Sequence, residues 1–353
     1  MMGERIKAAR HMAGLSQRAL AERVGVSAMT ISKYERGLAL PDSQMLIRLS
    51  QALGRPVEYF LRPIRVSVGL PAYRKRHNLP RKAEQAILAQ VEEWLERYLT
   101  LEALFPEECP RFRLPEGWPR LIHNEEEVEE AALDLRRAWG LGEGPLENLA
   151  EWLEDIGIKV GVLQTHDRFD ALTLVLEGQT PVMVVRAGVP GDRERFSLAH
   201  ELGHLVLQAG EGLDEERLAN RFAGAFLVPR PAVVRELGLR RQTLHLQELH
   251  LLKHKYGLSM QAWVLRARDV GILQRATAQR LFQAFRQRGW HLEEPGDPYP
   301  FEEPQRLQRL VIRAWVEGLI SETRASELLG EPLSAYWQRE GEKHALRFAP
   351  LGG

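Results

Sequence analysis

The sequence predicts a multidomain protein with an all-α N-terminal domain, an α+β core containing a small sheet, and a helical C-terminal segment. The chain has 353 residues, which is enough for two or three domains. Short amphipathic helix patterns fill the first sixty residues, whereas strand-like runs occur in the middle of the chain, directly before two helix patterns. The predicted segments are a first domain at 1–62, a linker at 63–82, a connector helix at 83–106, the α+β core at 120–272 and the C-terminal segment at 273–353.

Composition excludes several classes of protein. The chain is 44% apolar and 27% charged, so it can bury a sizeable core and is neither disordered nor collagen-like. No apolar run approaches the ~18 residues of a membrane helix, and the N-terminus lacks the apolar region of a signal peptide, so we expect a cytoplasmic protein without membrane partners. Cys109 is the one cysteine. A metal site would therefore have to use histidines and carboxylates.

Charge is unevenly distributed along the chain. Residues 1–82 hold 16 Lys and Arg against 5 Asp and Glu, a net charge of +11, although the whole chain is formally neutral. A basic N-terminal block on an acidic body indicates an end that faces nucleic acid. The alternative is an ordinary solvated basic face.

Two short helix patterns near the N-terminus have the spacing of a helix-turn-helix unit. Ser16 can cap SQRALAERV, Gly25 can end it, and Ser27 can cap SAMTISKYERG. Flanking helix patterns on both sides can close a small core. This arrangement is typical of a DNA-binding unit whose second helix enters the major groove.

The stretch 4–61 closely resembles the Xre family of Cro- and lambda-repressor-like domains, through GLSQRALAERVGVSAMTISKYERGLALPD. The resemblance implies a double-stranded DNA operator and a homodimer. It places these residues at the DNA: Gln17, Ser27, Ala28, Met29, Thr30, Lys33 and Arg36. Lysine and arginine suit phosphates, whereas Ser27, Met29 and Thr30 suit base edges or thymine methyls. The alternative is a helical bundle used for protein contacts.

The linker at 63–82 is rich in proline and basic residues. Its RKRH run at 74–77 either contacts the DNA backbone or keeps the linker extended and solvated. The connector helix at 83–106 is amphipathic, so its apolar face needs a partner. That partner is either the following domain or a second copy of the same helix.

The run FSLAHELGHLVLQ carries a pattern typical of metallopeptidases. His200 and His204 are four residues apart, so on a helix they project from one face and can hold one zinc ion. Glu201 can lie beside the metal without ligating it and accept the proton of a water molecule that the zinc activates. We expect Pro190, Gly191 and Asp192 to form the preceding turn, with Asp192 as the N-cap.

A catalytic zinc has three protein ligands and an open fourth position, and the next helix pattern supplies the third. In EGLDEERLANRFAGAFLVPRP, Glu216 can ligate the metal, and Asn220, one turn later, can orient a histidine. Glu215 is the competing ligand, but it lies ~100° around the helix from Glu216. Zinc suits two histidines and one glutamate best, although manganese or another first-row divalent ion is also compatible.

Residues 120–270 resemble the ImmA/IrrE metallopeptidases, through PGDRERFSLAHELGHLVL and EERLANRFAGAFLVP. The resemblance implies a zincin-like core with His200, His204 and Glu216 as zinc ligands and Glu201 as general base. It implies cleavage of helix-turn-helix repressors in stress, DNA-damage or mobile-element responses. One departure is the strand end VMVVRAG, where many relatives have a polar residue near Arg186.

Three strand-like segments, GIKVGVLQ, ALTLVLEG and PVMVVRAG, predict a small antiparallel sheet before the metal-binding helix. Residues 182–186 are expected at an edge, either binding an extended peptide or as an ordinary edge strand. Three residues are candidates for oxyanion stabilisation: Arg186, His245 and Tyr256. His250 and His254 are also four apart, but no suitable carboxylate follows them, so a helix surface is favoured over a second metal site.

Three functions remain compatible with these patterns. The first is a zinc endopeptidase fused to its own DNA-binding domain, acting on a repressor or on itself. The second is a non-proteolytic transcription regulator whose peptidase fold serves as sensor or dimerisation domain. The third is an antitoxin-like protein that binds a neighbouring protein. The intact Glu201 favours the first, because a purely structural zinc site does not need it.

Overall fold

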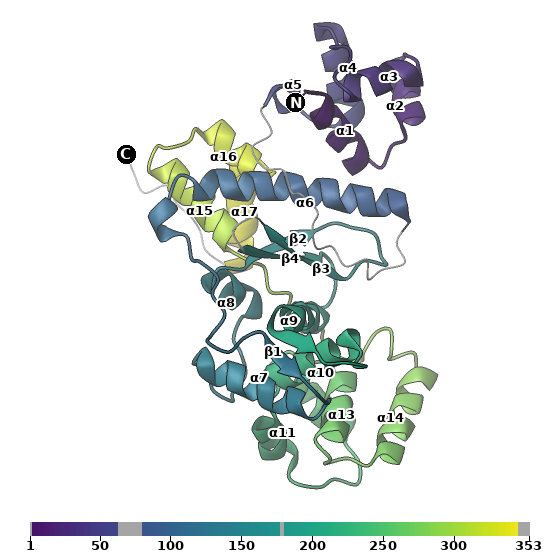
Figure 1. Ribbon diagram of the computed structural model, residues 1–353, viewed down its shortest axis with the longest axis vertical. Helices are drawn as coiled ribbons and strands as arrows, with labels where there is room; N and C mark the ends of the chain where they lie inside the picture. Colours follow the sequence, from purple (N-terminus) through teal and green to yellow (C-terminus); the bar gives the residue numbers. More distant parts are fainter. Residues whose placement is uncertain (1, 63–79, 177–179, 345–353) are drawn as a thin grey trace. The chain divides into compact units, whose positions relative to one another are not determined.

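The computed structural model describes residues 2–62, 80–176 and 180–344. It forms two compact units (Figure 1). The first contains the described residues up to Cys109 and those from Gln305 onward, and the second contains Pro110–Pro304. The predicted linker residues 63–79, including the RKRH run, lie outside the described residues. Among the residues that are described, no helix is long and apolar enough to cross a membrane.

The first unit begins with five short helices that form a helix-turn-helix domain. They are α1 Met2–Met12, α2 Gln17–Val24, α3 Ala28–Glu35, α4 Ser43–Leu53 and α5 Val57–Leu61. Ser16 and Ser27 cap α2 and α3 through their hydroxyl oxygens, and Gly25 ends α2 with a left-handed φ of 74°. The cap positions therefore set the turn between the two helices, as the sequence predicts.

Four further helices complete the first unit: α6 Arg81–Glu102, α15 Arg306–Val316, α16 Glu322–Leu329 and α17 Leu333–His344. Helix α6 contacts α1 of the N-terminal domain, and Arg5 of α1 forms a buried ion pair with Glu96 of α6. The C-terminal end of α6 packs against α15, with Leu101 and Val311 in one buried cluster. The connector helix thus has partners on both sides within its own unit.

The C-terminal residues predicted as one segment, 273–353, are divided between the two units. Helix α14, Arg275–Gln287, belongs to the second unit because Phe285 packs into that core. Helices α15 to α17 belong to the first unit, through the cluster around Leu101. The division falls after the proline-rich stretch that ends at Pro304.

The second unit is built around a three-stranded sheet and the helices packed on it. Its strands are β2 Lys159–Leu163, β3 Ala171–Leu176 and β4 Thr180–Arg186, in the order β2-β4-β3. The expectation of an antiparallel sheet is wrong for one pair, because β2 and β4 run parallel. The expected edge at 182–186 is also wrong. Strand β4 occupies the centre and Val182 to Val185 are buried, because β3 pairs with β4 as a hairpin and leaves the other side of β4 to β2.

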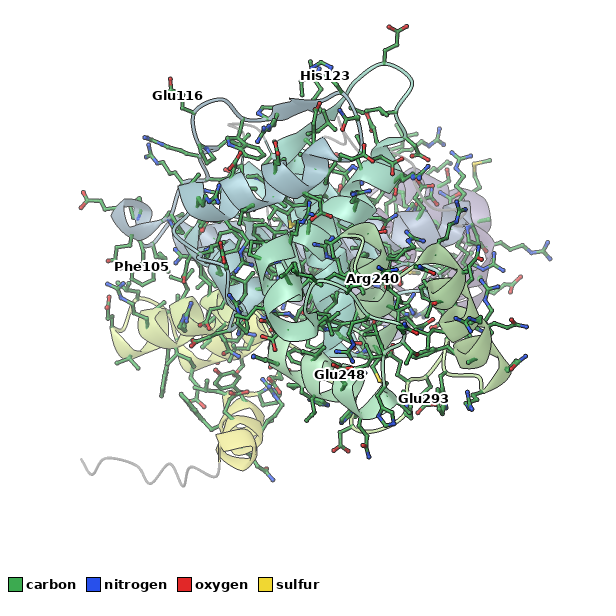
Figure 2. The ribbon with its side chains drawn as sticks, turned by 90° about the horizontal axis from the view of Figure 1, so that it is seen from below. Phe105, Glu116, His123, Arg240, Glu248 and Glu293 are labelled. Carbon is green, nitrogen blue, oxygen red and sulfur yellow. The ribbon has the colours of Figure 1, made fainter. Side chains whose placement is uncertain are left out.

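The second unit has further elements besides this sheet. They are β1 Arg120–Ile122, α7 Glu127–Ala138, α8 Leu149–Asp155, α9 Gly191–Val206, β5 Leu207–Ala209, α10 Glu215–Leu227, α11 Arg230–Leu237, α12 Leu246–Tyr256 and α13 Met260–Asp269. The short helix η1 Pro106–Glu108 belongs to the first unit, where it follows α6. Strands β1 and β5 form a separate parallel pair. Glu116 and His123 lie on the chain segments flanking β1 (Figure 2). Helix α9 contacts both β3 and β4, and α10 packs along α9.

Candidate metal centre

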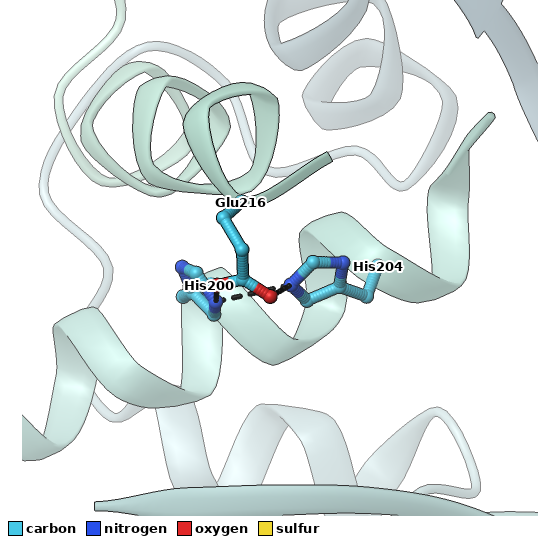
Figure 3. A group of neighbouring side chains, drawn as sticks. All are labelled: His200, His204 and Glu216. Carbon is cyan, nitrogen blue, oxygen red and sulfur yellow. Dashed lines mark hydrogen bonds and ion pairs between the residues drawn. The ribbon is translucent and has the colours of Figure 1, made fainter. Parts of the chain in front are cut away.

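Two neighbouring helices bring three potential metal ligands together. His200 and His204 lie one turn apart on α9, and Glu216 lies in the first turn of α10 (Figure 3). The start of α10 is set by Asp214, whose carboxylate accepts hydrogen bonds from the backbone N–H groups of Glu216 and Arg217 at 2.9 and 3.4 Å. The cap therefore fixes the backbone that carries the third ligand.

The separations between the donor atoms suit one metal ion. His200 Nε2 lies 3.0 Å from His204 Nε2, and the two carboxylate oxygens of Glu216 lie 3.3 Å from His200 Nε2 and 3.6 Å from His204 Nε2. Ligand atoms ~2.0 Å from a tetrahedral zinc ion lie roughly 3.3 Å from one another. Among the residues the structure describes, this is the group of histidine, cysteine and acidic side chains whose geometry could hold a metal.

Asn220 lies where it can orient the first histidine. Its Oδ1 is 3.1 Å from Nδ1 of His200. If Nδ1–H donates to this oxygen, the proton is held on Nδ1 and the Nε2 lone pair faces His204 and Glu216. The outer hydrogen bond thus selects the tautomer that a metal requires.

Burial differs across the three ligands. The side chains of His200 and His204 are 15% and 8% exposed, whereas that of Glu216 is 50% exposed. Glu201 follows His200 on α9 and is buried, with 4% of its surface exposed. The cluster is therefore held by protein on the α9 side and is open to solvent on the Glu216 side. Glu215 is not part of the cluster.

Gly203 allows the two ligand-bearing helices to approach closely. A Cβ at this position would lie 3.1 Å from Cδ1 of Phe222 and 3.2 Å from Cα of Ala219, both on α10. These contacts are tighter than ordinary packing, so glycine at this position sets the spacing between α9 and α10. That spacing places Glu216 against the histidines.

The N-terminal half of α9 rests on a buried charged cluster that sequence reasoning missed. Arg195 forms an ion pair with Glu302 and donates to the carbonyl of Leu146 at 3.0 Å. The second carboxylate oxygen of Glu302 accepts from the Leu149 N–H at 2.7 Å, and the Glu302 N–H donates to Glu194 at 2.9 Å. Burial raises the pKa of Glu194 to about 8. The segment before Pro304 is thereby joined to α8 and α9.

The expected N-cap of α9 is wrong. The helix begins at Gly191 after Pro190, and no side chain caps it. Asp192 is instead buried inside the first turn, 3.5 Å from Nζ of Lys253. Burial raises the pKa of Asp192, although Lys253 opposes that change. The N–H of Gly191 donates to the carbonyl of Tyr299, which takes the place of a side-chain cap.

The three candidates for oxyanion stabilisation have other contacts. Arg186 lies 3.4 Å from Asp167 and 3.9 Å from Asp170. His245 caps α12 by accepting from the N–H of Gln247, and the hydroxyl of Tyr256 donates to Glu236 at 2.8 Å. These bonds give each side chain a structural task within the second unit.

The paired histidines at 250 and 254 lie on α12. Their rings are 4.6 Å apart, and Nε2 of His254 lies 3.1 Å from the carbonyl oxygen of Asp297. Among the described residues, no carboxylate joins them in a metal-binding group.

Helix α3 carries most of the residues expected at DNA. Ala28, Met29 and Lys33 are exposed on it, and Arg36 is exposed at its end. The hydroxyl oxygen of Ser27 caps α3, since it accepts a hydrogen bond from the backbone N–H of Thr30 at 3.1 Å. It also lies 2.9 Å from the hydroxyl oxygen of Thr30.

Gln17, which is expected to brace the DNA backbone, donates to Glu35 at 2.7 Å. Glu35 is also paired with Arg10 in the buried interior of the domain. The buried carboxylate at the end of α3 thus links this helix to the start of α2 and to α1.

Comparisons with known proteins identify both domains. Residues 6–60 match the family described as Helix-turn-helix, and residues 154–268 match the IrrE N-terminal-like domain of peptidase family M78. The chain is similar to Repressor protein C2 of Salmonella phage P22, with 39% identity over 77 residues, 22% of this chain and 35% of that protein. It is similar to the HTH-type transcriptional regulator ImmR of Bacillus subtilis, with 35% identity over 60 residues, 17% of this chain and 47% of that protein.

A solved structure is also similar to part of this chain. The solution structure of the DNA-binding domain of the P22 C2 repressor is 43% identical, covering 17% of this chain and 80% of that chain, with a TM-score of 0.17. The chain spans about a third to a half of the length of the two curated relatives.

Proposed function

Because this chain joins a helix-turn-helix domain to an IrrE-like peptidase domain, we propose that it is a DNA-binding transcription regulator with a zinc-dependent endopeptidase domain. The observation that carries the peptidase proposal is the cluster of His200, His204 and Glu216, whose donor atoms have the spacing of zinc ligands. The proposed protein substrate is a helix-turn-helix repressor in a stress, DNA-damage or mobile-element response. The proposed location is the cytoplasm.

The proposed mechanism assigns one task to each residue of the centre. The two histidines and Glu216 would hold the ion, and Asn220 would keep the proton on the far nitrogen of His200. The chemistry that zinc would supply there is Lewis acidity, toward the scissile carbonyl and toward water. Glu201 is the general base that accepts a proton from this water and then delivers it to the leaving amine.

The exposed side of Glu216 is where an extended protein segment would enter. A carboxylate that is half exposed and still within reach of two largely buried histidines leaves one direction open for a substrate. Three protein ligands with one open position distinguish catalytic zinc sites from structural ones, which are closed. This difference favours the endopeptidase over a sensor domain with a structural metal.

The test of the peptidase proposal is cleavage by Glu201→Gln. We expect this variant to keep its metal and its fold but to cleave a co-expressed repressor at least 100-fold more slowly, the range for loss of a general base. Cleavage is followed by mass spectrometry of the products. Undiminished cleavage by Glu201→Gln would exclude the mechanism. Glu215→Ala is the control, and if it also abolished cleavage, the loss in Glu201→Gln would be a nonspecific effect.

The DNA-binding proposal rests on the exposed residues of α3 and predicts a homodimer on two half-sites about one helical turn apart. Lys33→Ala should weaken binding across sequences and lower the salt slope by about 1, as loss of one phosphate contact does. The operator is obtained by selection from random DNA, and affinity is measured by fluorescence anisotropy. An unchanged salt slope would show that Lys33 does not contact phosphate.

A further inference from the structure

Helix α14 presents a basic surface on an acidic unit. Residues 110–304 hold 24 Lys and Arg against 30 Asp and Glu, a net charge of −6, whereas residues 270–292 hold four arginines and no acidic residue. These are Arg275, Arg280, Arg286 and Arg288, and all four are exposed. Positive charge is therefore concentrated on one element of the second unit, the helix that packs against α13 (Figure 1).

The sequence of α14 gives the helix one buried side and one polar side. Ala278 and Phe285 are buried in the core of the second unit. The opposite side consists of exposed arginines and glutamines, together with Ala276. At about 100° per residue, four of these polar residues fall within roughly 80° of arc and form what we call the α14 face. They are Arg275, Gln279, Gln283 and Arg286.

The arginines of this region are not neutralised by the protein. Among the described residues, no carboxylate forms an ion pair with any of the four. Asp269, which precedes α14, is held by Arg268 at 2.7 Å, and Glu293 beyond the end of the helix pairs with none of them. The positive charge of the α14 face is therefore directed at solvent.

Other exposed arginines of the second unit behave differently. Arg193 lies 2.7 Å from Asp170, and Arg235 lies 3.8 Å from Glu143. An arginine that is already paired has less charge to offer to a partner. The α14 face is therefore distinguished from these positions by its free charge as well as by its exposure.

The spacing of the α14 face suits a polyanion with closely spaced charges. Arg275 and Arg286 are about 16 Å apart along the helix axis and about 20° apart around it. Each strand of double-stranded DNA carries one phosphate per ~3.4 Å of axis, so this length corresponds to roughly five phosphates. Both arginines can therefore contact one duplex at the same time.

The chemistry of the α14 face favours DNA over an acidic protein. The core of a protein interface is enriched in aromatic residues and other large apolar groups. Within the described part of the chain, no large apolar side chain of α14 is exposed. Glutamine amides, like guanidinium groups, donate to phosphate oxygens in protein–DNA complexes. An arginine and glutamine face without large apolar groups therefore fits a phosphate backbone better.

We propose that the α14 face binds the phosphate backbone of double-stranded DNA without sequence specificity. Arg275 and Arg286 contact phosphates, and Gln279 and Gln283 donate hydrogen bonds between them. The contact uses no residue of α3 or of the metal centre. It therefore stands or falls independently of the proposed function.

The test is the salt dependence of binding of the full chain to a random-sequence duplex of about 20 base pairs, measured by fluorescence anisotropy between roughly 50 and 200 mM salt. Arg275→Gln/Arg286→Gln removes two phosphate contacts at exposed positions and should lower the magnitude of the log–log slope by about 2. The matched control is Arg193→Gln/Arg235→Gln, which removes the same charge from exposed positions of the same unit. Its slope should be unchanged.

Two further variants separate the α14 face from other effects. Gln283→Glu places a carboxylate between the two arginines without removing either, so it should weaken binding several-fold at low salt. Lys33→Ala combined with Arg275→Gln/Arg286→Gln should give decreases in slope that add, because the two contacts are separate. An effect of the arginine variant without an effect of Lys33→Ala would contradict the assignment of α3 and leave the α14 face supported.

Four results would overturn the proposal. They are the absence of binding to the random duplex at the lowest salt, an unchanged slope in the arginine variant shown to be folded by circular dichroism, an equal loss in the matched control, and competition by poly-L-glutamate as strong as that by unlabelled duplex. The third result would show a general effect of net charge. The fourth would assign the α14 face to acidic proteins.

Discussion

Replacing Gly203 tests whether the close approach of α9 and α10 builds the metal centre. The glycine lies between His200 and His204 and faces α10, where a Cβ would be 3.1 Å from Phe222 Cδ1 and 3.2 Å from Ala219 Cα. Both neighbours are buried, and the contact at Ala219 is with backbone that no rotamer change can move. Gly203→Val should therefore push α10 away from α9.

Two opposing contributions set the change in the free energy of unfolding that we expect for Gly203→Val. Overpacking in a well-packed core costs about 1–3 kcal/mol of unfolding free energy. Valine is a better helix former than glycine by roughly 0.4 kcal/mol. We therefore expect a net loss of roughly 0.5–2.5 kcal/mol. Because Glu216 lies one turn before Ala219 on α10, zinc affinity should also fall by about tenfold or more, the range for groups that position ligands.

The assay is urea unfolding of the metal-free protein, together with zinc affinity from competition with a chelator. Arg193→Val is the control, since it places valine on the same helix at an exposed position. A Gly203→Val protein with unchanged stability and unchanged zinc affinity would refute the reasoning. Loss of stability without loss of zinc affinity would show that the spacing supports the core but not the metal centre.

Two further predictions concern the buried charges beneath α9. Burial raises the pKa of Glu194 to about 8, so the folded chain keeps a proton that the unfolded chain loses. Stability should then fall as pH rises from about 4.5 to about 8. Glu194→Gln should flatten this slope in urea unfolding, and an identical slope would contradict it. Arg195→Met leaves Glu302 buried without its partner and should cost about 3–5 kcal/mol. Adding Glu302→Gln should restore part of that stability, and a double variant no more stable than Arg195→Met would exclude the pair as the cause.

Much of the fold was predictable because its signals are local. Serine caps and glycine ends delimit α2 and α3, and their spacing identifies the helix-turn-helix domain without reference to distant residues. The fold class is confirmed, with a small sheet between two helical regions. Local hydrophobic patterns also identified the strands, but not the central place of β4, because strand order depends on pairing that the pattern of one strand does not encode.

The proposed metal ligands could be picked out from the sequence for a similar reason. A helix fixes the relation of His200 to His204 through four residues of sequence, and Glu216 follows in the next helix pattern. The support beneath them was not predictable, because Glu302 is 107 residues from Arg195 and neither residue belongs to a spacing motif. The one sequence signal for this ion pair was a charged residue, Arg195, within an otherwise apolar helix face.

The most direct test of the central claim is the metal content of the purified protein beside Glu216→Ala and Glu215→Ala, measured by elemental mass spectrometry. The two glutamates are adjacent on α10, and only Glu216 joins the histidine cluster. We predict about one zinc ion per chain in the wild type and in Glu215→Ala, and little in Glu216→Ala. Equal zinc in all three proteins, or none in the wild type after zinc is supplied, would contradict the three-ligand metal centre.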